Sequence, residues 1–206
     1  MRLYLKGNYE TSIYQTCIEF PWKMWFKERK GVKVGFSYAF NENFYLSLTL
    51  DKFSSNDERW GMADFRIGKD SWATFKRENI QLEFENDFIT DGRERGENLR
   101  IATTHTDILT VDKRAMYIMA VEVASAIDGQ ISEDDQETWM DVETFKELHK
   151  DVLSLSYDKA TDISVEELKS LKPVEDTLWD EEERLREEYI KIHGERVYDD
   201  EEEDDE

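Results

Sequence analysis

The spacing of apolar residues changes its period near Thr110, and this change sets the class of fold. Before Thr110, several segments alternate apolar and polar side chains in the two-residue period of a β-strand. After it, apolar residues recur at the spacing of one helical face. Strands that precede helices, without βαβ alternation, predict an α+β fold: an antiparallel sheet from the N-terminal half, partly covered by helices from the C-terminal half.

The N-terminal half supplies the expected sheet. Residues 32–40 and 44–50 alternate on either side of an Asn-Glu-Asn connection and form the clearest predicted hairpin. Residues 10–29 are ambiguous, because Pro21 interrupts an apolar face at helical spacing. Further strands are expected at 2–6, 62–67, 79–89 and 98–104, with a polar loop at 91–97.

The C-terminal half supplies the expected helices. Asp112 is the predicted N-cap of a helix that continues to Ile127, and the pair Asp128-Gly129 ends it. Three more helices are predicted. One begins at Asp141, one has Ser164 as its N-cap and is closed by Pro173, and a charged one runs from about Asp176 to His193.

The last eight residues, 199–206, are all Asp or Glu. Residues 175–206 hold 17 acidic side chains against 4 Lys or Arg, a net charge of −13, which leaves −9 of the total of −22 for residues 1–174. Carboxylates at this density repel one another and bury no apolar surface. The sequence therefore predicts a single α+β domain over 1–174, a charged helical extension over 175–197 and a disordered acidic tail over 198–206.

The negative charge limits the classes of partner. It repels phosphate backbones and anionic membranes and attracts basic protein surfaces, so a basic protein partner is expected and direct binding to nucleic acid or a membrane is not. No segment reaches the roughly 18 apolar residues of a spanning helix. The single cysteine, Cys17, excludes an internal disulfide. These features predict a soluble protein of the reducing cytoplasm.

No cofactor and no metal are expected. The nine glycines form no phosphate-binding loop of the G-x-x-x-x-G-K-[ST] or G-x-G-x-x-G kind. No histidine has a second histidine at helical metal-binding spacing. The segment around Gly129 lacks the first two carboxylates of a calcium loop, because Ala124 and Ala126 occupy those positions.

His105 is the histidine whose setting best suits catalysis. Asp107 lies two positions beyond it, so both side chains would share one face of a strand and could act as an acid–base pair. The alternative interpretation is a polar histidine near a loop. His149 and His193 fall on charged helical faces and are expected to be exposed.

Residues 116–145 combine a helix of small residues, a Gly-x-Ile strand at Gly129–Ile131, an acidic turn, Trp139 and a helix that carries Phe145. This segment resembles a module of small cytoplasmic bacterial proteins, among them immunity proteins of polymorphic toxin systems. The resemblance implies a related fold in which Gly129 serves the turn while Ile131, Trp139 and Phe145 pack. It transfers no catalytic residue.

Together these features favour an acidic, non-catalytic inhibitor or immunity-type protein that blocks a basic partner such as a toxin, a nuclease or a phage-defence effector. Its carboxylates would mimic nucleic-acid charge, and its aromatic residues would supply the anchors. Two alternatives are an enzyme whose site includes His105 and a regulatory or assembly module. The predicted partner-binding residues are Glu181, Glu182, Glu183, Asp199, Asp200, Glu201, Glu202, Glu203, Asp204, Asp205 and Glu206.

Overall fold

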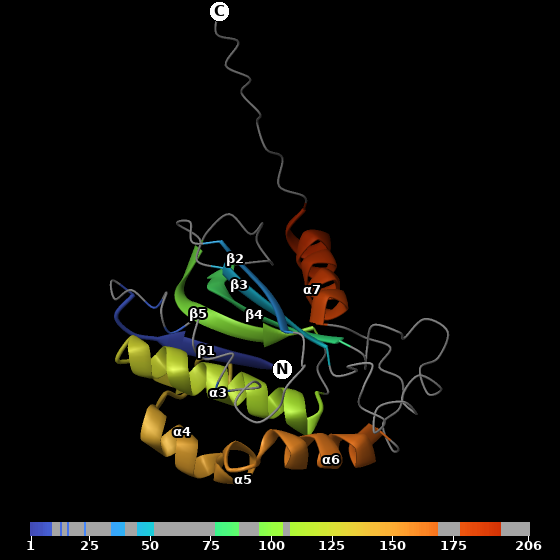
Figure 1. The fold of residues 1–206 in the computed structure, drawn as a ribbon. Coiled ribbons are helices and arrows are strands. Elements are labelled where there is room, and N and C mark those ends of the chain that lie inside the picture. The colour runs from blue at the N-terminus through green and yellow to red at the C-terminus, as the bar shows by residue number, and fades with distance from the viewer. Residues whose placement is uncertain are drawn as a thin grey trace, which may run out of the picture.

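The computed structural model describes residues 1–9, 13, 16, 23, 34–39, 45–51, 77–86, 95–104, 108–168 and 178–194. A sheet is covered on one face by the long helix α3 (Thr110–Ala126), and a layer of shorter helices packs against α3 (Figure 1). This arrangement confirms the predicted α+β fold. The domain boundaries predicted near 174 and 197 and the predicted disordered tail lie outside the described residues.

The strands of the described residues form one seven-stranded sheet, in which neighbours are antiparallel and take the order β2-β3-β4-β5-β1-β6-β7. β1 therefore lies between β5 and β6, where Tyr4 is opposite Arg100 on one side and Ser132 on the other. The strands are β1 (Arg2–Lys6), β2 (Val34–Ala39), β3 (Tyr45–Asp51), β4 (Arg77–Asn86), β5 (Arg95–Thr103), β6 (Gln130–Ser132) and β7 (Met140–Asp141).

The predicted hairpin is confirmed, because β2 and β3 pair with Phe36 opposite Leu48. The polar loop predicted at 91–97 is shorter than expected, since β5 already begins at Arg95. Arg95 pairs with Asn86 beyond a register shift between Phe84 and Asn86, and such an irregularity disrupts the ladder only locally. The strand predicted at 62–67 lies outside the described residues, as do residues 10–29 except 13, 16 and 23.

The core lies between the sheet and α3. Alternation along β1, β4 and β5 places one apolar row of each strand on the face toward α3, and the helix contributes apolar residues at helical spacing. Burial of this apolar surface is the main stabilising term of the fold. The fully buried members include Leu3, Leu5, Ile80, Leu82, Ile101, Ala115, Met119, Val123 and Ile131.

The opposite side of the same strands is polar and also buried. Arg100 in β5 donates to Glu83 in β4, with 2.6 Å between Nη2 and Oε1, and the two residues are cross-strand neighbours. Tyr4 of β1 lies beside Arg100 and is buried as well. Loss of either partner would leave an uncompensated buried charge, which is strongly destabilising.

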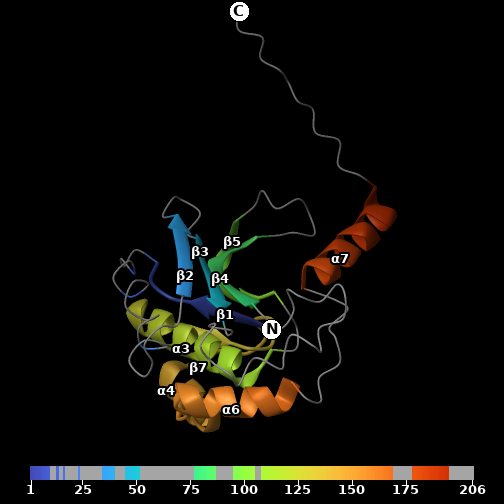
Figure 2. The same cartoon turned by 45° about the vertical axis from the view of Figure 1, so that its right-hand side comes forward.

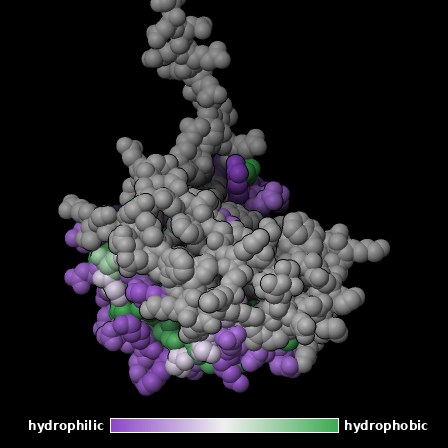
Figure 3. Space-filling view, in the orientation of Figure 1, coloured by the Kyte–Doolittle hydropathy of each residue, from purple (hydrophilic) through white to green (hydrophobic). Residues whose placement is uncertain are grey.

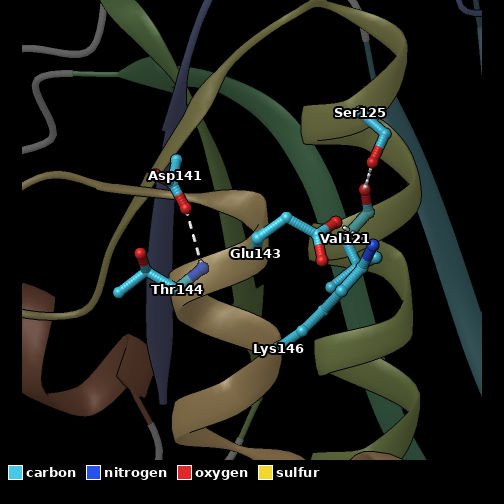
Figure 4. Close-up of polar contacts among 6 residues, drawn as sticks. All are labelled: Val121, Ser125, Asp141, Glu143, Thr144 and Lys146. Atoms are coloured by element: carbon cyan, nitrogen blue, oxygen red, sulfur yellow. Dashed lines mark hydrogen bonds and ion pairs between the residues drawn. The ribbon is translucent and has the colours of Figure 1, made fainter.

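The helices after α3 are α4 (Val142–Leu148), α5 (Lys150–Leu153), α6 (Tyr157–Leu168) and α7 (Leu178–His193). The predicted helix start at Asp141 is confirmed, and Asp141 is the N-cap residue of α4. Its carboxylate accepts a hydrogen bond from the backbone N–H of Thr144 at 2.7 Å (Figure 4). This bond satisfies a donor that the first turn of α4 leaves free, and the acceptor charge suits the positive end of the helix.

The prediction that Asp112 caps α3 is wrong. The helix begins at Thr110, with Leu109 at the N-cap position, so Asp112 lies in the first turn and is fully buried. The backbone N–H of Thr110 instead donates to the Glu167 carboxylate in α6 at 2.9 Å. A carboxylate from another helix thus lies at the positive N-terminus of α3, where an acceptor is most favourable.

The prediction that Ser164 begins a helix is also wrong. α6 already starts at Tyr157, and Ser164 lies in its interior with its side chain fully buried. The Ser164 hydroxyl accepts a hydrogen bond from the backbone N–H of Val111 at 2.9 Å. Ser164 is therefore a capping residue, but for α3 rather than for its own helix.

Gly129 makes the junction between α3 and β6 possible, and the predicted helix end at Asp128-Gly129 is confirmed. A Cβ atom on Gly129 would lie 2.6 Å from the carbonyl oxygen of Lys6 and 2.8 Å from Cγ1 of Ile127. Only glycine allows two backbones to approach this closely. Asp128 before it adopts a left-handed conformation with φ of 50°.

Candidate protein-binding surface

The net charge of the chain is concentrated after α3. Residues 1–127 hold 19 acidic and 18 basic side chains, a net charge of −1. Residues 128–206 carry the remaining −21 of the total of −22. The segment that contributes β1 to β5 and α3 is therefore close to neutral, and nearly all of the negative charge lies C-terminal to α3.

The first acidic region is the outer layer, defined as residues 128–167, which comprises β6, β7, α4, α5, α6 and their connections. It holds 13 carboxylates and three lysines, a net charge of −10. Hydrophilic side chains dominate its described surface, along the lower edge of Figure 3. Its exposed carboxylates are Asp128, Asp134, Asp135, Glu137, Asp141, Glu143, Glu147, Asp151, Asp158, Asp162 and Glu166.

Two lysines of the outer layer form ion pairs within α4 and at its end. Lys146 pairs with Glu143 at 2.7 Å, and Lys150 pairs with Glu147 at 3.1 Å (Figure 4 shows the first pair). Exposed pairs at this spacing contribute a few tenths of a kcal/mol to the helix. Leu148, next to Glu147, is 61% exposed. The outer layer thus offers carboxylates and one apolar side chain to a partner.

The turn between β6 and β7 holds one carboxylate firmly in its charged form. The hydroxyl and backbone N–H of Thr138 and the hydroxyl of Ser132 all donate to Asp134, the last two at 2.8 Å. These hydrogen bonds, those from Thr138 above all, lower the pKa of Asp134 to about 2. Asp134 therefore adds a fixed negative charge to the outer layer at physiological pH.

The second acidic region is α7, which lies apart from α4 and α6 in both views (Figures 1 and 2). It holds six carboxylates, three Arg or Lys and a net charge of −3. Glu183, one of the predicted partner-binding residues, is exposed here. Glu181 and Glu182 belong to the same helix, whereas residues 199–206 lie outside the described residues.

α7 also exposes apolar side chains that were not predicted as binding residues. Leu185 is 41% exposed and Ile192 is 76% exposed. They are seven positions apart and therefore lie on the same side of the helix. The sequence carried one signal of this, since Leu185, Tyr189 and Ile192 recur at helical spacing among charged residues.

The predicted pair His105 and Asp107 lies outside the described residues, and so its arrangement stays a prediction. His193 is exposed as expected and stacks on Tyr189, with 4.2 Å between the ring centroids. The expectation for His149 is wrong. Its side chain is largely covered, because the imidazole packs on the rings of Tyr117 and Phe145 at centroid distances of 4.2 and 4.5 Å.

His149 completes a polar cluster with Glu133 and Tyr117. Its Nε2 lies 2.8 Å from a carboxylate oxygen of Glu133, and the phenol of Tyr117 also donates a hydrogen bond to the Glu133 carboxylate. Burial and then the Glu133 charge raise the pKa of Tyr117, so that its phenol stays protonated. The cluster joins α3, the β6–β7 turn and the end of α4. Its rings leave His149 little room to meet a substrate, and we assign the cluster to the stability of the outer layer.

Within the described residues, no group of three or more His, Cys, Asp or Glu side chains could hold a metal ion. None of the helices described is both long and apolar enough to cross a membrane. No family model, no curated protein and no solved structure matches the chain.

Proposed function

We propose that this chain is an acidic inhibitor or immunity-type binding protein that captures a basic protein partner in the cytoplasm and blocks its cationic surface. The observation that carries the proposal is the segregation of charge. Residues 1–127, which contribute β1 to β5 and α3, carry a net charge of −1, whereas residues 128–206, which contribute the outer layer and α7, carry −21. Stability of the core does not require so many exposed carboxylates.

The chemistry of such a surface suits capture of a cation. A potential of one sign steers an oppositely charged protein into encounter and raises the association rate. Carboxylates then take the place that the phosphates of a nucleic acid would occupy in a cationic groove. The resemblance of residues 116–145 to immunity-type proteins makes a toxin or nuclease the first class of partner to test.

The test has two stages. The full chain is immobilised at low salt and exposed to extract of its native cells, and bound proteins are eluted by rising salt, because screening weakens charge-driven binding. Each eluted protein is then purified and its activity is titrated with the free chain. We expect a basic protein whose activity falls to zero at a fixed stoichiometric ratio.

The matched control is an unrelated acidic protein of equal net charge on the same support. A partner captured equally by both proteins would reflect ion exchange only. Capture of acidic proteins alone, or capture of a basic protein whose activity remains unchanged at saturation, would contradict the proposal.

A further inference from the structure

We infer that the exposed apolar side of α7 makes the main apolar contact with the proposed partner. The partner surface that it binds would be cationic and would carry an apolar strip. The α7 stripe is defined as Leu185, Tyr189 and Ile192. This inference rests on the proposed function and deepens it, because it names which of the two acidic regions makes the apolar contact and what chemistry the partner needs.

The geometry of α7 places these three residues together. Leu185, Tyr189 and Ile192 succeed one another at spacings of four and three, so they lie on one side of the helix. Leu185 and Ile192 are 41% and 76% exposed, and Tyr189 is half-buried. Leu178 falls seven positions before Leu185 and continues the same register along the helix. Amphipathic helices often bind other proteins in this way, with the apolar row of the helix lying in a hydrophobic groove of the partner.

The net charge around the stripe selects the partner. Glu183 and Glu188 are exposed on α7, and Glu188 lies three positions after Leu185. Glu187 pairs with Lys191 at 3.6 Å, and with the exposed Arg184 and Arg186 counted the helix keeps a net charge of −3. Eight further carboxylates lie in the sequence only a few residues beyond Gly194. An apolar strip bordered by Lys or Arg is complementary to this arrangement, because the charges guide the encounter and the desolvated apolar groups supply the lasting affinity.

The same charges disfavour the other occupants. A second copy of the chain would bring together two molecules that each carry −22, with two α7 helices of −3 at the contact. An anionic membrane surface would be repelled as well. A cationic protein is the occupant for which both the apolar row and its surroundings are favourable.

The experiment uses three probes of equal positive charge. The first is an amphipathic peptide of leucine and lysine at helical spacing, the second is its scrambled sequence, and the third is polylysine. Affinities for the full chain are measured by calorimetry at low and at physiological salt. We expect the amphipathic peptide to bind more tightly than the scrambled one, with a preference that persists when salt weakens all three.

The decisive variant combines Leu185→Ser and Ile192→Ser, and it should lower affinity for the amphipathic peptide by about tenfold or more while leaving polylysine unchanged. Leu148→Ser is the matched control, since it removes an exposed leucine from the outer layer, and it should change neither affinity. Circular dichroism checks that the variants fold. If the combined variant has less helix than the parent, Ile192→Ser alone replaces it, because Ile192 lies in the last turn of α7. This single variant should lower affinity for the amphipathic peptide by a smaller factor.

The inference is overturned if the unmodified chain does not prefer the amphipathic peptide, if the stripe variants retain the preference, or if Leu148→Ser removes it. It is also overturned if sedimentation shows a dimer of the unmodified chain that the stripe variant loses, because a second copy would then occupy α7. Failure of polylysine to bind at low salt would instead contradict the proposed function itself.

Discussion

The hydroxyl of Ser164 in α6 accepts a hydrogen bond from the backbone N–H of Val111 in the first turn of α3, at 2.9 Å. Glu167, one turn further along α6, accepts from the neighbouring N–H of Thr110 at 2.9 Å. Helix α6 thus satisfies two of the donors that every helix N-terminus leaves without an intrahelical partner. The acidic outer layer is therefore joined to the core helix by specific polar bonds as well as by packing.

Replacement of Ser164 should accordingly destabilise the fold although alanine is the better helix former. Ser164→Ala leaves the buried N–H of Val111 without its acceptor, and we expect a loss of about 1 kcal/mol in the free energy of unfolding, measured in a denaturant melt. Ser125→Ala is the control, because the exposed Ser125 hydroxyl only donates to the carbonyl of Val121 within α3 (Figure 4). Equal stabilities of the two variants would contradict the capping role.

This cap also shows where the sequence stops being informative. The start of α4 at Asp141 was predictable, because the cap that begins it is local: the Asp141 carboxylate and the N–H of Thr144 are three residues apart. The caps of α3 were not predictable, since Ser164 and Val111 are 53 residues apart. The sequence around Ser164 does not tell whether its hydroxyl caps its own helix or another one.

The strand periods and the hairpin were predictable for the same local reason, whereas the position of β1 was not. β1 pairs with β5 and β6, from residues near 100 and near 131, and the alternation of residues 2–6 does not specify its neighbours. His149 is predicted to be exposed because two of its three contacts, Tyr117 and Glu133, are 32 and 16 positions away in the sequence. The acidic character of α7 was predictable, but the exposure of Leu185 and Ile192 depends on what covers the helix.

Gly129 should tolerate no side chain. Gly129→Ala would bring a Cβ to 2.6 Å from the carbonyl oxygen of Lys6, and backbone on both sides would have to shift. We expect a loss of about 1–3 kcal/mol in the free energy of unfolding, as for other overpacked sites. Gly194→Ala is the comparison, because its Cβ would meet no atom within 4 Å and only the positive φ of 82° opposes it, at the exposed end of α7. A Gly129→Ala protein as stable as the parent would show that the backbones of Lys6 and Gly129 can move apart at little cost in free energy.

Tyr117 should make the fold sensitive to alkali. Its pKa is raised in the folded protein by burial and by Glu133, while a tyrosine of the unfolded chain ionises at about pH 10. The unfolded state therefore releases this proton first, so that the Tyr117 contribution to stability is present below about pH 10 and falls as pH rises above it.

Tyr117→Phe removes that titration and should make the alkaline decline of stability less steep. The measurement is the free energy of unfolding of parent and variant at each pH from neutrality to pH about 11, because their difference cancels the other groups. A difference that stays constant over this range would contradict the raised pKa.

The predicted acidic tail should act on the rate of association more than on the final affinity. Residues 199–206 contain eight carboxylates and no apolar side chain, so they offer long-range attraction without an anchor. Truncation after Tyr198 should lower the association rate constant for a cationic protein or peptide and flatten its dependence on salt, with a smaller effect on the dissociation rate.

A variant in which every carboxylate of 199–206 is changed to its amide keeps the length of the chain and should behave like the truncation. Surface plasmon resonance at several salt concentrations separates the two rate constants. If the amide variant keeps the association rate of the parent while truncation lowers it, the tail contributes through its backbone or length rather than through its charge.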